Sequence, residues 1–294
     1  MAKIVAIART AWRELIRQPA IWIVTGLVLL MIVMFRYFTL FGLGEEHSMI
    51  REMALASITL AGLLVAVLGA STVLAEEEER RTLLTLLSKP VRRGEIIIGK
   101  FFGIAAAVLL VFVPLTAVYV GAVCWSQLVF GREAPAVGQQ VLAFLLGGGA
   151  WSLVKASMLA YAGVLVLAAV SIAISTRLPM IVNVVLTLGV FALGHQADSI
   201  LALLYPKAAD GTPMIQSVEQ LGFLARLAQY PLVAVGKVFY GLVPGMEAFN
   251  AGQAVAVDAA VPGWYVLMAF GYAVLYIGLA LLIAAALFRR REFA

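Results

Sequence analysis

The sequence predicts an all-α, polytopic membrane protein with six transmembrane helices. Of its 294 residues, 63% are hydrophobic and 13% are charged, against roughly 45–50% and 25% in soluble domains. Six runs have about 20 apolar residues each, the length that crosses roughly 30 Å of hydrocarbon, and none alternates like a membrane β-strand. Because a backbone in lipid must satisfy its own hydrogen bonds, these runs should form helices of a single domain, residues 1–294. The expected spans are residues 21–42, 54–75, 101–125, 153–174, 180–204 and 264–288.

The first element, residues 1–19, is expected to be a helix lying in the membrane interface. Its apolar residues repeat at helical spacing beside four basic ones, which are Lys3, Arg9, Arg13 and Arg17. One face is therefore apolar and the other basic, as in interfacial helices. Trp12 should lie at headgroup depth, and Pro19 should break the helix before the first span. A frayed tail is the alternative. The apolar run that follows is too long for a signal-peptide core and is expected to remain as an anchor.

The distribution of basic residues predicts the orientation. Fourteen of the 21 lysines and arginines fall on one side of the membrane and six on the other, counting Lys155 at the start of the fourth span, and Arg36 lies near the end of the first span. By the positive-inside rule, both termini and residues 76–100 should be cytoplasmic. The net charge of +5 reflects this bias, and no separate basic face predicts nucleic-acid binding.

Residues 76–100, between the second and third spans, are predicted to dock a cytoplasmic protein. Thr82 can cap a short helix that Pro90 ends. One face of this helix carries Leu83, Leu84, Leu87 and Val91. So short a helix is unstable alone, and its leucines lie outside the lipid, so something should cover them. A loop resting on headgroups is the alternative, but the four glutamates 76–79 are unfavourable beside an anionic leaflet. A protein partner is therefore favoured.

Residues 205–263, between the fifth and sixth spans, are expected to form helices on the outer face. The segment is too long for a turn and too apolar to be disordered. Its longest apolar run, residues 232–243, is too short to cross a bilayer, and several prolines divide the segment. The helices should pack on the outer surface or enter the membrane partway. Two further spans are the structural alternative.

The pattern of residues 77–100 resembles the coupling segment of ABC-2 type transporter permeases, particularly the branch related to nitrous-oxide-reductase maturation and gliding-motility permeases. The matching positions are Glu77, Glu79, Thr82, Leu83, Leu86, Leu87, Ser88, Pro90, Val91, Arg93, Ile96, Gly99 and Lys100. Residues 242–250 are also similar to an outer Leu-Pro-x-x-x-x-Phe element of that family. Arg81 stands where the family usually has glycine, which leaves open the angle at which the coupling helix departs from the second span.

The resemblance implies the membrane subunit of an ATP-driven transporter, an exporter in the bacterial inner membrane. It implies pairing with a second permease copy, as a homodimer, and with separate ABC ATPase subunits. The ATPase contacts would be Glu77, Glu79, Thr82, Leu83, Leu84, Leu86, Leu87, Ser88, Pro90, Val91 and Arg93. The chain lacks a G-x-x-x-x-G-K-[ST] phosphate loop, so ATP and Mg²⁺ should bind the partner, and no cofactor or catalytic residue is expected here.

Two other classes of function stay open. A mechanotransmission scaffold would use the same ATPase docking but drive an outer-face or periplasmic protein through residues 205–263 instead of moving a solute. A sealed, leucine-lined dimer interface would favour this scaffold, and a continuous polar cavity would favour transport. A membrane-embedded enzyme is disfavoured, because no Ser/His, HExxH or paired-aspartate arrangement lies within the spans.

Polar residues within the fifth span are candidates for a substrate pathway, because they are costly in lipid unless they face protein or water. Asn183 and Thr187 lie one turn apart on one face, and hydrogen bonding between helices is the alternative. His195 is the third candidate, with a satisfied interfacial histidine as its alternative. The single cysteine, Cys124, excludes an internal disulfide, and no metal-ligand spacing occurs. Rows of small residues predict close helix contacts at Gly62, Ala66 and Ala70, and at Gly99, Gly103 and Ala107.

Overall fold

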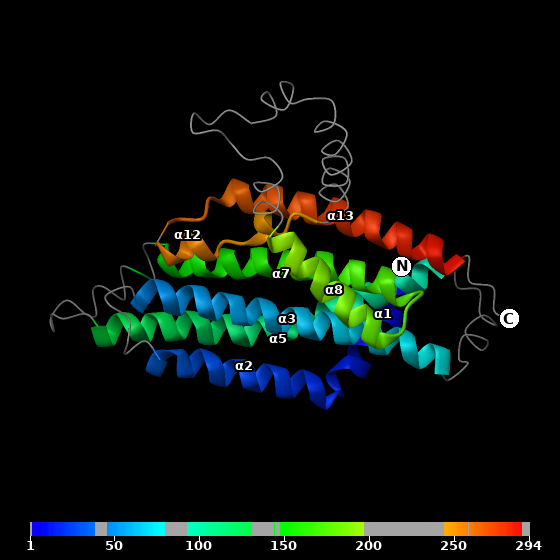
Figure 1. Cartoon of the computed structure of the whole chain (residues 1–294), viewed down its shortest axis with the longest axis horizontal. Helices are drawn as coiled ribbons and strands as arrows, with labels where there is room; N and C mark the ends of the chain where they lie inside the picture. The colour runs from blue at the N-terminus through cyan, green and yellow to red at the C-terminus, as the bar shows by residue number, and fades with distance from the viewer. Residues whose placement is uncertain are drawn as a thin grey trace, which may run out of the picture. The chain divides into compact units, whose positions relative to one another are not determined.

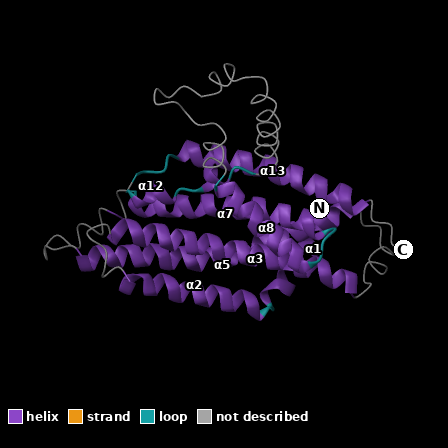
Figure 2. Ribbon diagram, viewed as in Figure 1, coloured by secondary structure: helices purple, strands orange, loops and turns teal. Residues whose placement is uncertain are grey.

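The structure is a computed structural model that describes residues 2–38, 46–79, 93–130, 144, 148–196, 244–257 and 259–289. These residues are helical apart from short connections, and no strand occurs among them (Figure 2). The prediction of an all-α protein is therefore confirmed. The chain divides into two compact units. The first comprises Met1–Thr187 with Phe249–Ala294, and the second comprises Leu188–Ala248.

The first unit is a bundle of long helices. In chain order they are α1 (Ala2–Ile16), α2 (Pro19–Phe38), α3 (Glu46–Glu79), α5 (Arg93–Phe130), α7 (Gly149–Ser175), the short α12 (Gly252–Ala256) and α13 (Gly263–Arg289). Helices α2, α3, α5 and α7 run side by side, α13 packs on α7, and α1 packs on α5 (Figure 1). Helix α8 (Met180–His195) begins in this unit and ends in the second, where the 3-10 helix η2 (Met246–Phe249) begins.

Among the described residues, four helices are long and apolar enough to cross a membrane, over Ser48–Val73, Gly94–Trp125, Gly149–Ser175 and Gly263–Phe288. They correspond to the second, third, fourth and sixth expected spans. The first expected span begins within a bent pair of helices, Lys3–Ile16 and Pro19–Phe35, whose axes differ by 64°. The fifth is described only as α8, which has 16 residues, and residues 197–204 lie outside the described part. The count of six spans stays a prediction.

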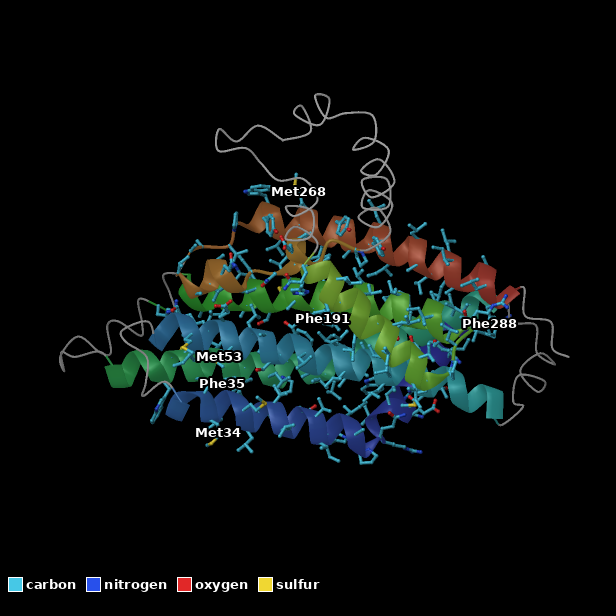
Figure 3. The ribbon with its side chains drawn as sticks, in the orientation of Figure 1. Met34, Phe35, Met53, Phe191, Met268 and Phe288 are labelled. Atoms are coloured by element: carbon cyan, nitrogen blue, oxygen red, sulfur yellow. The ribbon has the colours of Figure 1, made fainter. Side chains whose placement is uncertain are left out.

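Burial separates the central helices of the bundle from its peripheral ones. About two-thirds of the apolar window of α5 and of α7 is buried (67% in each), against 17% of that in α13. Met268 points away from the bundle and is 68% exposed, whereas Phe288 on the same helix is buried (Figure 3). On α2, Met34 is likewise exposed and its neighbour Phe35 is buried. Most of the apolar surface of helix α13 is therefore not covered by the described part of the chain.

Small residues allow close helix contacts at the predicted positions. A Cβ atom at Gly62 would clash with the ring of Phe112, and one at Gly99 would lie 2.8 Å from Cβ of Ile7. One at Gly103 would lie 2.7 Å from Cβ of Ala11. The glycines of both rows therefore mark helix contacts, and α1 lies on Gly99 and Gly103 of the second row.

Helix α1 agrees with the predicted amphipathic helix in extent, but its apolar face packs against protein. Ala11 and Leu15 are buried, at 3% and 0% exposure. A Cβ at Gly69 of α3 would lie 3.1 Å from Cδ2 of Leu15. The apolar periodicity of α1 thus reflects contacts with α3 and α5, which the sequence pattern alone could not distinguish from contacts with lipid.

Candidate functional site

The segment expected to dock a partner is flanked by the end of α3 and the start of α5. Most of its predicted contact residues lie outside the described part: Thr82, Leu83, Leu84, Leu86, Leu87, Ser88, Pro90 and Val91. Glu77 and Glu79 belong to the last turn of α3, and Arg93 opens α5, with side chains that are also not described. The structure shows how the two flanking helices are bonded to the rest of the bundle. The bonds are made at three consecutive residues, Ser71–Val73, which we call the α3 junction.

Val73 joins α3 to α5. Its carbonyl oxygen accepts a hydrogen bond of 2.9 Å from Nζ of Lys100. Lys100, which directly precedes the third expected span, is buried at 4% exposure. A buried ammonium is stable only when protein groups replace its water, so this bond restrains α5 against α3 where the two helices meet the docking segment.

Thr72 joins α3 to the connection between α1 and α2. Its Oγ1 accepts a hydrogen bond of 3.0 Å from Nε2 of Gln18. Nearby, the indole nitrogen of Trp22 donates to the carbonyl oxygen of Ile16 at 2.8 Å, which bridges the bend between α1 and α2. Helix α1 also lies on Gly99 and Gly103 of α5. It therefore contacts both helices that flank the docking segment, α3 and α5.

Ser71 joins α3 to α7 and α8 through the amide of Asn183. Nδ2 of Asn183 donates to Oγ of Ser71 at 2.7 Å and to Oγ of Ser171 at 2.9 Å. Its Oδ1 lies 3.2 Å from both Oγ of Ser171 and Oγ1 of Thr187, which can donate to it. All four side chains are at most 2% exposed. An amide has two donors and two acceptor sites, and protein groups occupy both kinds here, so the geometry favours the interhelical role.

His195 belongs to the second unit. Its Nδ1 is 3.3 Å from the carbonyl oxygen of Phe191, and the two rings have centroids 4.4 Å apart. The structure thus brings Asn183 and Thr187 together and assigns His195 to a separate local contact. In the described ranges, no three His, Cys, Asp or Glu side chains are grouped to hold a metal ion.

Two cations at the end of the bundle away from the α3 junction have partners that the sequence did not indicate. Arg51 is buried and donates from Nη1 to the carbonyl oxygen of Val255 at 3.2 Å. Lys155 donates from Nζ to the carbonyl oxygen of Val261 at 2.9 Å. They hold the segment before α13 onto α3 and α7. A cation inside an apolar helix signals an oxygen partner, but which carbonyl it meets depends on the fold.

The described helices form a bundle, and several of them are long and apolar enough to cross a membrane. This architecture is that of a multi-pass membrane protein. Residues 5–293 match the family model described as ABC-2 family transporter protein. The chain belongs to that family, and it is a transport membrane component rather than a catalytic one. No curated protein matches the chain by sequence. The expected branch within the family stays a prediction.

Proposed function

We propose that the chain is the permease subunit of an ATP-driven exporter in the bacterial inner membrane. Two copies pair as a homodimer, and each docks an ABC ATPase subunit through residues 76–100 on the cytoplasmic side. ATP and Mg²⁺ bind the ATPase. In this scheme, closure of the ATPase subunits moves the docking segment, and the membrane helices convert that movement into transport.

The observation that carries this proposal is the α3 junction. Rigid coupling requires that a displaced segment cannot move without its neighbours. Ser71, Thr72 and Val73 bond to three different parts of the bundle, within two helical turns of the docking segment. Since buried polar groups lose their bonds only at substantial cost, a displacement of α3 is passed to α1, α5, α7 and α8.

For the docking residues themselves, the proposal rests on helical spacing and on the resemblance of residues 77–100 to the coupling segment of the family. Leu83, Leu84 and Leu87 form the face that enters a groove on the ATPase, with the remaining predicted contacts around it. This is the helix-in-groove mode of recognition, in which spaced apolar anchors provide most of the affinity. Asn183 and Thr187 act in this scheme by joining helices, and His195 remains the candidate for contact with a solute.

The test is ATP hydrolysis by the purified chain, alone and co-expressed with the ATPase encoded in its native operon. The chain alone should be inactive, and the co-expressed ATPase should co-purify and hydrolyse ATP. Robust turnover by the isolated chain would contradict the assignment of ATP to a partner.

A second candidate, the mechanotransmission scaffold, is favoured by the opposite end of the bundle. Arg51 and Lys155 fix the segment before α13 to α3 and α7, so movement of α3 would also reach the outer segment. A fluorophore at Val257, which is exposed, should then respond to ATP turnover. A response without any solute movement across the vesicle membrane would favour the scaffold over the exporter.

A further inference from the structure

The outward face of α1 carries a row of arginines. Arg9, Arg13 and Arg17 are all exposed and follow each other at intervals of four residues, which keeps them on one side of the helix. Within the described part of the chain, none of the three guanidinium groups has a hydrogen bond or an ion pair. We call this surface the arginine face.

Four other cations of the bundle have hydrogen-bond partners within the protein. Arg51, Lys100, Lys155 and Arg177 each donate to a main-chain carbonyl oxygen, those of Val255, Val73, Val261 and Leu287 respectively. Their charges are satisfied by the protein itself. Within the described ranges, the three arginines of α1 have no such carbonyl partner, and all three are exposed.

The position of α1 indicates what that ligand is. Its apolar face packs on Gly69, Gly99 and Gly103, all of which lie within the candidate spans Ser48–Val73 and Gly94–Trp125. Helix α1 thus flanks the candidate membrane helices near their ends, and its opposite side is turned away from them at that level.

The start of α2 indicates the same depth in the membrane for the neighbouring α1. Trp22, four residues into this apolar helix, is 53% exposed, and exposed indoles gather at the membrane–water interface. Helices α1 and α2 meet at 64°, so when α2 crosses the bilayer, α1 lies closer to the membrane plane than to its normal. The arginine face is then at headgroup depth, where phosphate is the abundant anion and matches the guanidinium fork.

We propose that Arg9, Arg13 and Arg17 bind the phosphate groups of anionic phospholipids. An acidic surface on a partner protein is the competing ligand, and the level of α1 along the bundle favours the lipid. The inference takes from the proposed function only that the chain resides in a membrane. It depends on neither the ATPase nor the transported solute.

The test is a lipid titration of the full chain in detergent micelles, followed by native mass spectrometry. Phosphatidylglycerol should bind in preference to phosphatidylcholine, and added salt should weaken that preference. The triple variant R9Q/R13Q/R17Q should lose about a hundredfold in affinity for phosphatidylglycerol, roughly fivefold per arginine. The triple lysine variant should keep most of the preference because it keeps the charge.

Arg177→Gln is the matched control, because it removes a cation that already has a carbonyl partner. It should bind phosphatidylglycerol like the parent. If the triple glutamine variant does not fold, Arg13→Gln alone, with its expected fivefold loss, decides the question. The proposal is overturned if the parent binds both lipids equally, if the glutamine variants bind like the parent, or if Arg177→Gln loses as much. Loss of ATPase capture with unchanged lipid binding would assign the arginine face to a protein partner.

Discussion

At the scale of single residues, Asn183 shows how one amide can fix three helices. The sequence predicted that Asn183 and Thr187 share a face, because they lie one turn apart. It could not identify Ser71 as a partner, because that residue is 112 positions away and only packing brings the two together. The same holds for Arg51 and Val255, 204 positions apart.

Replacing Asn183 with alanine should destabilise the helical bundle. Hydrogen bonds between membrane helices contribute about 0.6 kcal/mol on average and up to about 1.7 kcal/mol, and Asn183 makes several. The free energy of unfolding should therefore fall by about 1–2 kcal/mol, measured by denaturant titration in micelles.

Gln253→Ala is the control for this measurement, because the Gln253 side chain is exposed and should change stability little. If Asn183→Ala unfolds like the parent but alters transport, Asn183 acts on the solute instead of joining helices.

At the scale of elements, the contact of α1 with α5 depends on residues without side chains. A Cβ at Gly103 would lie 2.8 Å from the carbonyl oxygen of Ala8, while one at Gly121 of the same helix meets nothing within 4 Å. The sequence predicted the small-residue row and the apolar face of α1 separately. That they pack on each other could not be predicted, because lipid and protein select the same apolar periodicity.

Gly103→Ala should loosen α1, because backbone atoms on the other side of the contact cannot yield without moving the helix. Overpacking of this kind costs typically about 1–3 kcal/mol. Trypsin should then cleave faster at Arg9, Arg13 and Arg17. Gly121→Ala serves as the control and should be neutral or slightly stabilising, since alanine is the better helix former. Equal cleavage of both variants would mean that α1 is not held at Gly103.

At the scale of the whole molecule, the helical class and four of the expected spans follow directly from apolar length. Hydropathy predicts where a chain can cross a membrane, but not how a helix such as α8 ends. Helix α8 is shorter than a membrane span, and α2 follows a bend after α1. For these two elements, membrane crossing therefore stays a prediction. Orientation rests on the asymmetry of charge between the two sides.

Cys124 tests that orientation, because it is the only cysteine and is partly exposed. It lies 24 residues beyond Lys100, or about 36 Å along α5, at the end of a candidate span. A membrane-impermeant thiol reagent applied to intact cells should label it. Labelling only from the cytoplasmic side of inverted vesicles would reverse the proposed topology.

The most direct test of the central claim is capture of the ATPase by variants of the docking segment. Leu87→Glu removes about 1.5–3 kcal/mol of side-chain burial and adds the desolvation of a charge. Since 1.4 kcal/mol is a tenfold change in affinity, the Kd for the ATPase should rise at least about tenfold. Lys89→Ala, which changes a charge at the rim, should act mildly. Membrane insertion of both variants is checked by Cys124 labelling. Binding of Leu87→Glu at parental strength, with failure of Lys89→Ala, would contradict docking through the leucine face.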